Sequence, residues 1–145
     1  MNDTIGAPSK APMHLWAVGI LTLLWNSVGG FSYTMTRLGM LEQLGMGEAE
    51  ITFFESAPLW SNFFWALGVW GAIAGSVLIL LRSRYAVHAI IIAIIGLLGS
   101  NTWQYAIATD MPESLQSPAL TIMIWVTTLF MLFYATRMTR AGVLK

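Results

Sequence analysis

The sequence predicts an all-α integral membrane protein, a bundle of four helices that each cross a lipid bilayer. Four stretches contain no charged residue, at 15–36, 59–81, 85–109 and 119–136. Hydrophobic residues make up 57% of the chain and charged residues only 10%, and the mean hydropathy is +0.68, far from the composition of a soluble domain. Each stretch is close to the ~20 residues that a helix needs to cross a hydrocarbon layer of ~30 Å. We therefore expect one membrane domain over residues 1–145.

Local signals support each span. The first follows Lys10, as in a signal peptide, but it is longer than the apolar region of such peptides, so we retain it as a helix. The second begins after Pro58 and the fourth after Ser117, at Pro118, where the missing N–H of proline is harmless in a first helical turn. The third is apolar nearly all round over 86–98, a pattern typical of a helix surrounded by lipid and packed protein.

The loop over residues 37–58 is the only sizeable segment outside the spans. Within it, residues 48–55 could form a short helix with Ile51 and Phe54 on one face, and we expect this helix to lie along the membrane surface. A lid over a substrate site is the less favoured interpretation.

The basic residues are distributed unequally between the two sides that four crossings define. One side, here called the basic end, carries the N-terminus, residues 82–84 and the C-terminus, whereas the acidic end carries 37–58 and 110–118. The basic end holds Lys10, Arg82, Arg84, Arg137, Arg140 and Lys145. Only Arg37 lies at the acidic end, so the positive-inside rule predicts that both termini are cytoplasmic.

Several kinds of chemistry are not expected. The chain has no cysteine, which excludes disulfides, thiol catalysis and zinc-thiolate sites built from its own residues. His88 is the one histidine in the spans, which also lack carboxylates, so a carboxylate proton relay is not predicted. No nucleophile–base pair, carboxylate dyad or metal-ligand triad stands at a usable spacing, so we predict neither an enzyme nor a metal or cofactor site. A net charge of zero gives no reason to expect nucleic acid as a partner.

Aromatic and amide neighbours form the candidate solute-binding site: Trp25, Asn26, Asn101, Trp103 and Gln104. Asn26 falls near mid-bilayer, and Asn101 and Gln104 fall ~7–11 Å toward the acidic end at the helical rise per residue. We expect Asn26 to bond with these two amides in one cavity. The alternative, which we favour, is that such groups only join helices, at ~0.6–2 kcal/mol each.

The second span carries small residues at small-x-x-x-small spacing: Gly68, Gly71, Ala72 and Gly75. Such spacing predicts close approach of two helix backbones. It does not decide whether the partner helix belongs to the same chain or to a second copy.

Several short motifs of the chain resemble those of a known family. They are Trp25-Asn26 with Gly29 or Gly30 and Tyr33, Phe54-x-Ser56-x-Pro58, and Ala66-x-Gly68-Val69-Trp70-Gly71-x-x-x-Gly75-Ser76. In these residues the chain resembles a family of small four-span bacterial inner-membrane proteins that are often labelled sugar transporters. The resemblance implies a multi-pass protein of the bacterial inner membrane.

Two functional hypotheses of different classes follow, and we rank them nearly equal. In the first, the protein binds or passes a small neutral polar solute as a homo-oligomer, with the glycine face of the second span as the seam between copies. In the second, it is a non-catalytic accessory subunit that packs, within the lipid bilayer, against a larger membrane complex.

Overall fold

A computed structural model describes residues 10–145, and the N-terminus, which the charge pattern predicts to be cytoplasmic, lies outside the described residues. This part of the chain contains helices and no strand. The α-helices are α1 (Met13–Arg37), α2 (Glu48–Glu55), α3 (Leu59–Leu80), α4 (Ala86–Thr102) and α5 (Pro118–Arg140). Four helical segments are long and apolar enough to cross a membrane, so the described chain is all-α as predicted, and its helices support the multi-pass prediction.

The expected span boundaries hold with two differences. α5 continues to Arg140, beyond the predicted end at 136, because a charged residue ends a lipid-facing stretch without ending a helix, and arginines suit the last turn. α4 ends at Thr102 and continues as a π-helical turn, η2 (Trp103–Ile107), in which the Ala108 N–H bonds the Trp103 carbonyl at 2.7 Å. The short helix predicted over 48–55 is present as α2.

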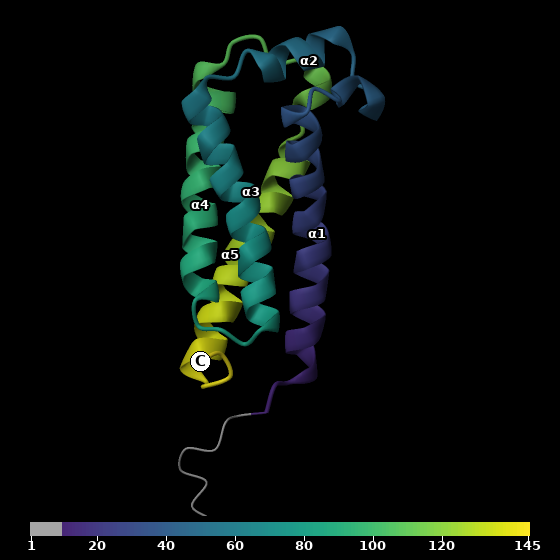
Figure 1. Cartoon of the computed structure of the whole chain (residues 1–145). Helices are drawn as coiled ribbons and strands as arrows, with labels where there is room; N and C mark the ends of the chain where they lie inside the picture. The colour runs from purple at the N-terminus through teal and green to yellow at the C-terminus, as the bar shows by residue number, and fades with distance from the viewer. Residues whose placement is uncertain (1–9) are drawn as a thin grey trace, which may run out of the picture.

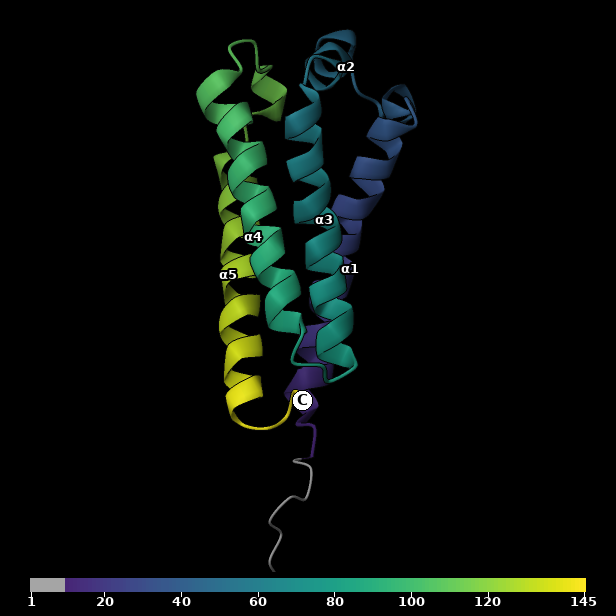
Figure 2. The same ribbon diagram turned by 60° about the vertical axis from the view of Figure 1, so that its left-hand side comes forward.

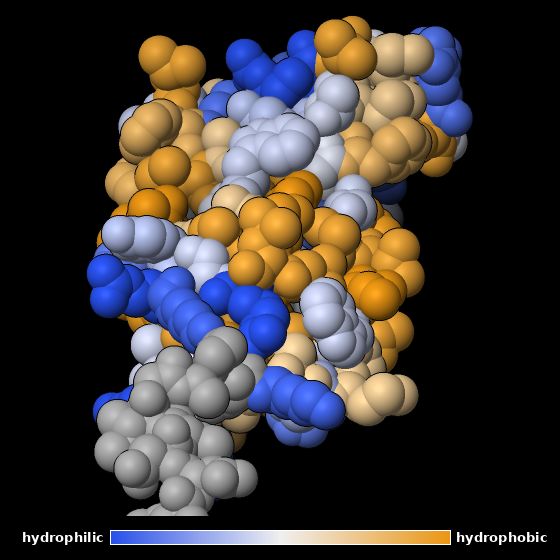
Figure 3. Space-filling model, turned by 60° about the horizontal axis from the view of Figure 1, so that its bottom comes forward, coloured by the Kyte–Doolittle hydropathy of each residue, from blue (hydrophilic) through white to orange (hydrophobic). Residues whose placement is uncertain are grey.

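The long helices run side by side, with α3 between α1 and α4 and with α5 packed on α4 and α3 (Figures 1 and 2). The loop after α3 and the C-terminal residues lie at one end of the molecule, and α2 lies at the other. The basic and acidic ends are therefore opposite ends of the helices. Figure 3 shows hydrophilic side chains gathered at the basic end, with orange hydrophobic residues over the adjoining flank.

α3 and α4 approach each other closely because glycines line the contact. A Cβ added at Gly71 would lie 3.0 Å from the backbone nitrogen of Ala93 and 3.1 Å from the carbonyl oxygen of Ala89. One added at Gly96 would collide with the backbone of Gly68. The glycine face of α3 is thus covered by α4 of the same chain, so the expectation that it forms the seam of an oligomer is wrong.

The basic end is closed by a packed core. The backbone of Lys145 pairs with Arg82 and Arg84, since its N–H bonds the Arg82 carbonyl at 2.9 Å and its carbonyl accepts from the Arg84 N–H at 3.1 Å. This pairing holds Leu144, which is 2% exposed, in one apolar cluster with Leu15, Ile79, Ile90 and Met131.

Candidate functional site

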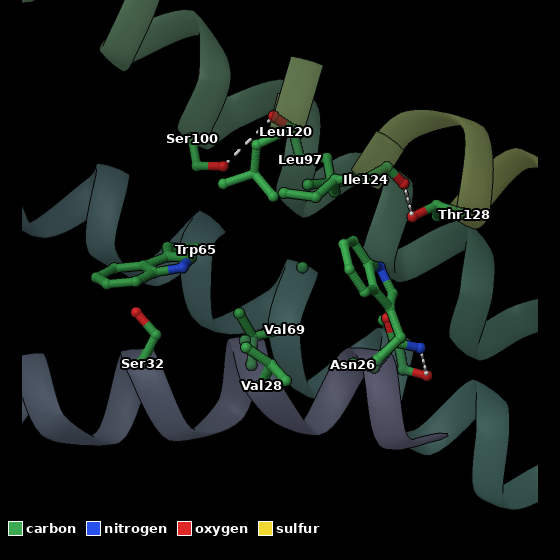
Figure 4. A pocket seen from close by; sticks show the side chains of 14 residues that line it. Asn26, Val28, Ser32, Trp65, Val69, Leu97, Ser100, Leu120, Ile124 and Thr128 are labelled. Atoms are coloured by element: carbon green, nitrogen blue, oxygen red, sulfur yellow. Dashed lines mark hydrogen bonds between the residues drawn. The ribbon is translucent and has the colours of Figure 1, made fainter. Parts of the chain in front are cut away.

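A cavity of about 320 Å³ lies where the four long helices separate toward the acidic end. This volume is at the lower end of the roughly 300–1,000 Å³ that small-molecule sites occupy. All four long helices contribute to its walls, and Figure 4 shows the lining side chains. They are Trp25, Asn26, Val28, Gly29 and Ser32 of α1, Trp65, Gly68, Val69 and Ala72 of α3, Leu97 and Ser100 of α4, and Leu120, Ile124 and Thr128 of α5.

Asn26 of α1 is held in place by hydrogen bonds to α3 and α5. Its amide nitrogen donates to the Ser76 hydroxyl at 3.0 Å, to the Ala72 carbonyl at 3.3 Å and to the Met131 sulfur at 3.4 Å. Ser76 in turn donates to the Thr22 hydroxyl at 3.0 Å, and Thr22 donates to the Val18 carbonyl at 2.7 Å. Because the Ala72 carbonyl can only accept, the amide nitrogen of Asn26 must face it. The orientation of the amide is thereby fixed.

The opposite atom of this amide is free. The Asn26 Oδ1 atom bonds no protein group among residues 10–145, and Asn26 lines the cavity. Figure 4 shows the amide nitrogen bonded on the side away from Val28 and Ser32. Since no fully buried polar side-chain atom in the described chain lacks a partner, the unbonded oxygen is not fully buried, and its residue lines the cavity. The Asn26 Oδ1 atom is therefore a hydrogen-bond acceptor that has no protein donor, at a residue near the middle of α1.

Unpaired donors line the same space. The indole N–H groups of Trp25 and Trp65 and the hydroxyl of Ser32 bond no acceptor among the described residues, and all three side chains are half-buried cavity walls. Figure 4 shows the nitrogen-bearing edge of the Trp65 ring directed toward the middle of the cavity. The hydroxyls of Ser100 and Thr128, by contrast, bond the carbonyls of Leu97 and Ile124 on their own helices.

An aromatic cluster covers the cavity at the acidic end. The Trp65 ring stacks on Phe54 of α2 at 5.8 Å between ring centroids and meets Tyr33 edge-on at 5.0 Å. Beside it, Phe53 of α2 packs on Trp103 at 5.1 Å. These rings lie between the cavity and the solvent beyond α2, so α2 acts as its cover.

Polar contacts fasten this cover. The Glu50 carboxylate accepts from the hydroxyl of Ser114, in the short helix η3 (Glu113–Leu115), and so joins α2 to η3; it also caps α2 itself by accepting from the Gly47 N–H at 3.1 Å. Tyr105 of η2 and Thr121 of α5 share a hydroxyl–hydroxyl bond of 2.5 Å, which ties the upper ends of α4 and α5 together.

Only part of the predicted site is assembled. Trp25 and Asn26 line the cavity, whereas Asn101, Trp103 and Gln104 do not. Gln104 lies 3.9 Å from the Met111 sulfur and Trp103 lies against α2, so the expected bonds of Asn26 to Asn101 and Gln104 are absent. The reason is helix order: the polar face of α1 packs on α3, not on α4.

Sequence reasoning missed Trp65 and Ser32 as cavity residues. A signal was available for Trp65, because it precedes Gly68 by three residues on the small-residue face of α3, and residues three apart share a helix face. Ser32 carried a similar signal, because it follows Gly29 on α1 by three residues.

The cavity is neutral. No ionisable acid or base lines it, and its walls are apolar except for the groups named above. Residues 10–145 also contain no group of three potential metal-ligating side chains among His, Cys, Asp and Glu. Burying an ion in such a space would carry a large desolvation penalty, which favours a neutral molecule with an apolar body and few hydrogen-bonding atoms.

Comparison with known proteins does not assign a family. No family model, no curated protein and no solved structure matches the chain.

Proposed function

We propose that this chain is a four-helix membrane bundle that binds a small neutral molecule in the cavity, and that the ligand joins an apolar body to a hydroxyl group. A hydroxyl both donates and accepts, so it can donate to Asn26 Oδ1 while accepting from an indole N–H. The proposal keeps the neutral, hydroxyl-bearing solute predicted from the sequence and makes its body apolar, in agreement with the cavity walls.

One observation carries this proposal: the side-chain oxygen of Asn26 faces an apolar cavity without a partner, while the nitrogen of the same amide is fully engaged. A hydrogen-bonding group that only joins helices has no reason to present a free acceptor to a cavity. In hydrocarbon an unmatched polar atom is unfavourable, and a bound hydroxyl would satisfy it.

A probe that reports on the cavity tests the proposal. The probe is a medium-chain alkyl alcohol with bromine at its far end, because bromine quenches tryptophan fluorescence on contact and Trp25 and Trp65 line the cavity. We expect saturable quenching of the protein in nanodiscs, reversed by the unbrominated alcohol. Absence of any saturable quenching would contradict the proposed binding.

Two variants separate binding from helix joining. Asn26→Leu removes the cavity acceptor, and we expect it to weaken probe affinity about tenfold or more, the loss of one buried hydrogen bond of ~1.4 kcal/mol. Ser76→Ala removes a partner of the Asn26 amide outside the cavity lining, and we expect near-normal affinity with lower thermal stability. Equal probe affinity in both variants would assign Asn26 to helix joining alone.

Binding is favoured over passage for the single chain. Below Asn26 and Thr128 the space between the helices is filled by the Ser76–Thr22 hydrogen bond and the apolar cluster around Ile79 and Met131.

The accessory-subunit hypothesis stays a prediction, but one argument for it is lost, since the small residues of α3 pack inside the chain. The resemblance to small bacterial inner-membrane proteins also stays a prediction.

We also propose that the basic end faces the cytoplasm, because six basic residues lie at that end and one at the other. A reporter fused after Lys145 should then be cytoplasmic, and one inserted at Gly47 should be on the opposite side. A cytoplasmic reporter at Gly47 would reverse the orientation.

A further inference from the structure

The cavity is closed on the sides where helices touch. α1 meets α3 through Gly29, whose added Cβ would lie 3.8 Å from Val69, and through Asn26, which bonds the Ala72 carbonyl. α3 meets α4 along the glycines, where backbones are in contact. α4 and α5 pack together and share the Tyr105–Thr121 hydrogen bond at their upper ends. A ligand cannot pass between these pairs without separating packed helices.

Both ends are closed as well. At the acidic end the cover of α2 is fastened by Glu50 and Ser114, and Phe54 stacks on the cavity residue Trp65. Toward the basic end, the amide of Asn26 reaches the Met131 sulfur of α5, and the buried core begins below it.

One side remains, between α1 and the first turns of α5. The two helices are joined at His14 and Tyr134, whose side chains bond at 2.5 Å, and again at Asn26 and Met131. Above these points, no hydrogen bond or ring contact among residues 10–145 joins α1 to α5. Val28 and Leu120 line the cavity from the two helices and are also 65% and 50% exposed, so they stand at its rim. This rim lies within two spans, where the surrounding medium is lipid.

Resting on the proposed function, we infer that the cavity is loaded sideways from the bilayer, through the gap between Val28 and Leu120, and that its ligand is therefore a lipid-soluble alcohol. A molecule that arrives through hydrocarbon must be apolar over most of its length. The unpaired groups at Asn26, Trp25 and Trp65 then select its hydroxyl after it has entered. A water-soluble sugar or other polyol has no route through this gap, because it would have to leave water for hydrocarbon first.

Cross-linking after loading tests the route. The chain has no cysteine, so Val28→Cys/Leu120→Cys places the only two thiols at the rim. The protein is loaded with the brominated alcohol in nanodiscs, joined by a bifunctional maleimide, and mixed with probe-free vesicles. We expect release of the probe to slow about tenfold or more, because changes at one interface commonly alter binding rates by about one to three powers of ten. Release that is unchanged or faster overturns the inference.

The matched control closes the other candidate route. Glu50→Cys/Ser114→Cys joins α2 to η3, where the native side chains already bond, and we expect unchanged release. Slower release in this pair, with normal release in the rim pair, would show loading from water beneath α2. Val28→Trp narrows the rim without a cross-link and should slow both loading and release.

Two competitors test the ligand class. The matching bromoalkane, which lacks the hydroxyl, should quench at least tenfold less tightly than the alcohol, and equal affinity would mean that any acyl chain fills the cavity. A water-soluble polyol should not displace the probe, and displacement would overturn the lipid-soluble class. Failure of the rim cross-link or of the polyol test leaves saturable probe binding, and hence the proposed function, intact, whereas equal affinity of the bromoalkane would also remove the hydroxyl from the proposed function.

Discussion

The contact between α3 and α4 and the gap between α1 and α5 show how the same kind of helix gives opposite packing. At the first, Gly68, Gly71 and Gly96 allow the two backbones to touch. At the second, large side chains such as Val28 and Leu120 stand at the facing edges, and the helices meet only farther down. In lipid, apolar side chains gain nothing by leaving hydrocarbon, so shape decides where helices close. The comparison teaches that the gap beside the cavity stays open where α1 and α5 face each other with large side chains.

The largest expected effect is at the closest point of the α3–α4 contact. Gly96→Ala would drive a methyl group into the backbone of Gly68, where no flexible side chain can yield. We expect a loss of more than about 3 kcal/mol in the free energy of unfolding, beyond the usual 1–3 kcal/mol of overpacking. Denaturation in mixed micelles measures it.

Gly68→Ala is the control, since its added Cβ would meet the Leu97 nitrogen at 3.4 Å, an ordinary contact. The unfolding free energy should change by less than about 1 kcal/mol, because alanine favours helix by a similar amount. If the two variants lose the same free energy of unfolding, the close backbone contact is not what holds α3 to α4.

The opposite response is expected in the α4 wall of the cavity. Ser100→Leu adds bulk to the cavity wall, and filling a cavity commonly raises the unfolding free energy by about 0.5–2 kcal/mol. The same variant should abolish saturable quenching by the brominated alcohol, because the leucine occupies its space. Destabilisation together with retained probe binding would mean that the probe does not occupy the space beside Ser100.

The smallest effect concerns the polar bond that joins α1 to α3. A double-mutant cycle of Asn26→Leu and Ser76→Ala should give a coupling energy of about 0.6 kcal/mol, the average for such bonds between membrane helices. A coupling energy of zero would show that the two side chains do not support each other in the folded protein.

Much of the fold could be predicted because charge and hydropathy act locally. The absence of charge marked all four spans, and prolines marked two helix starts. The end of α5 was missed because Arg137 and Arg140 continue a helix as readily as they end an apolar stretch.

The site was harder to predict from the sequence than the fold, because it depends on which helices are neighbours. Periodicity identified the inward face of α1 that contains Asn26, but not the helix opposite to it, and the assumption that Asn101 and Gln104 faced it was wrong. Ser76, on the small-residue face of α3, was the missing clue: the helix with the most small residues is the one its neighbours approach most closely.

The hydrogen bonds that start at Asn26 all point in one direction, from the amide to Ser76, then to Thr22, then to the Val18 carbonyl. Bonds in such a chain polarise one another, so each donor strengthens when the atom behind it accepts. A ligand hydroxyl that donates to Asn26 Oδ1 would therefore strengthen every later bond, as far as the Val18 carbonyl, about two turns of α1 nearer the basic end. Ligand binding in the cavity would then make the packing of α1 against α3 cooperatively more rigid, without moving either helix.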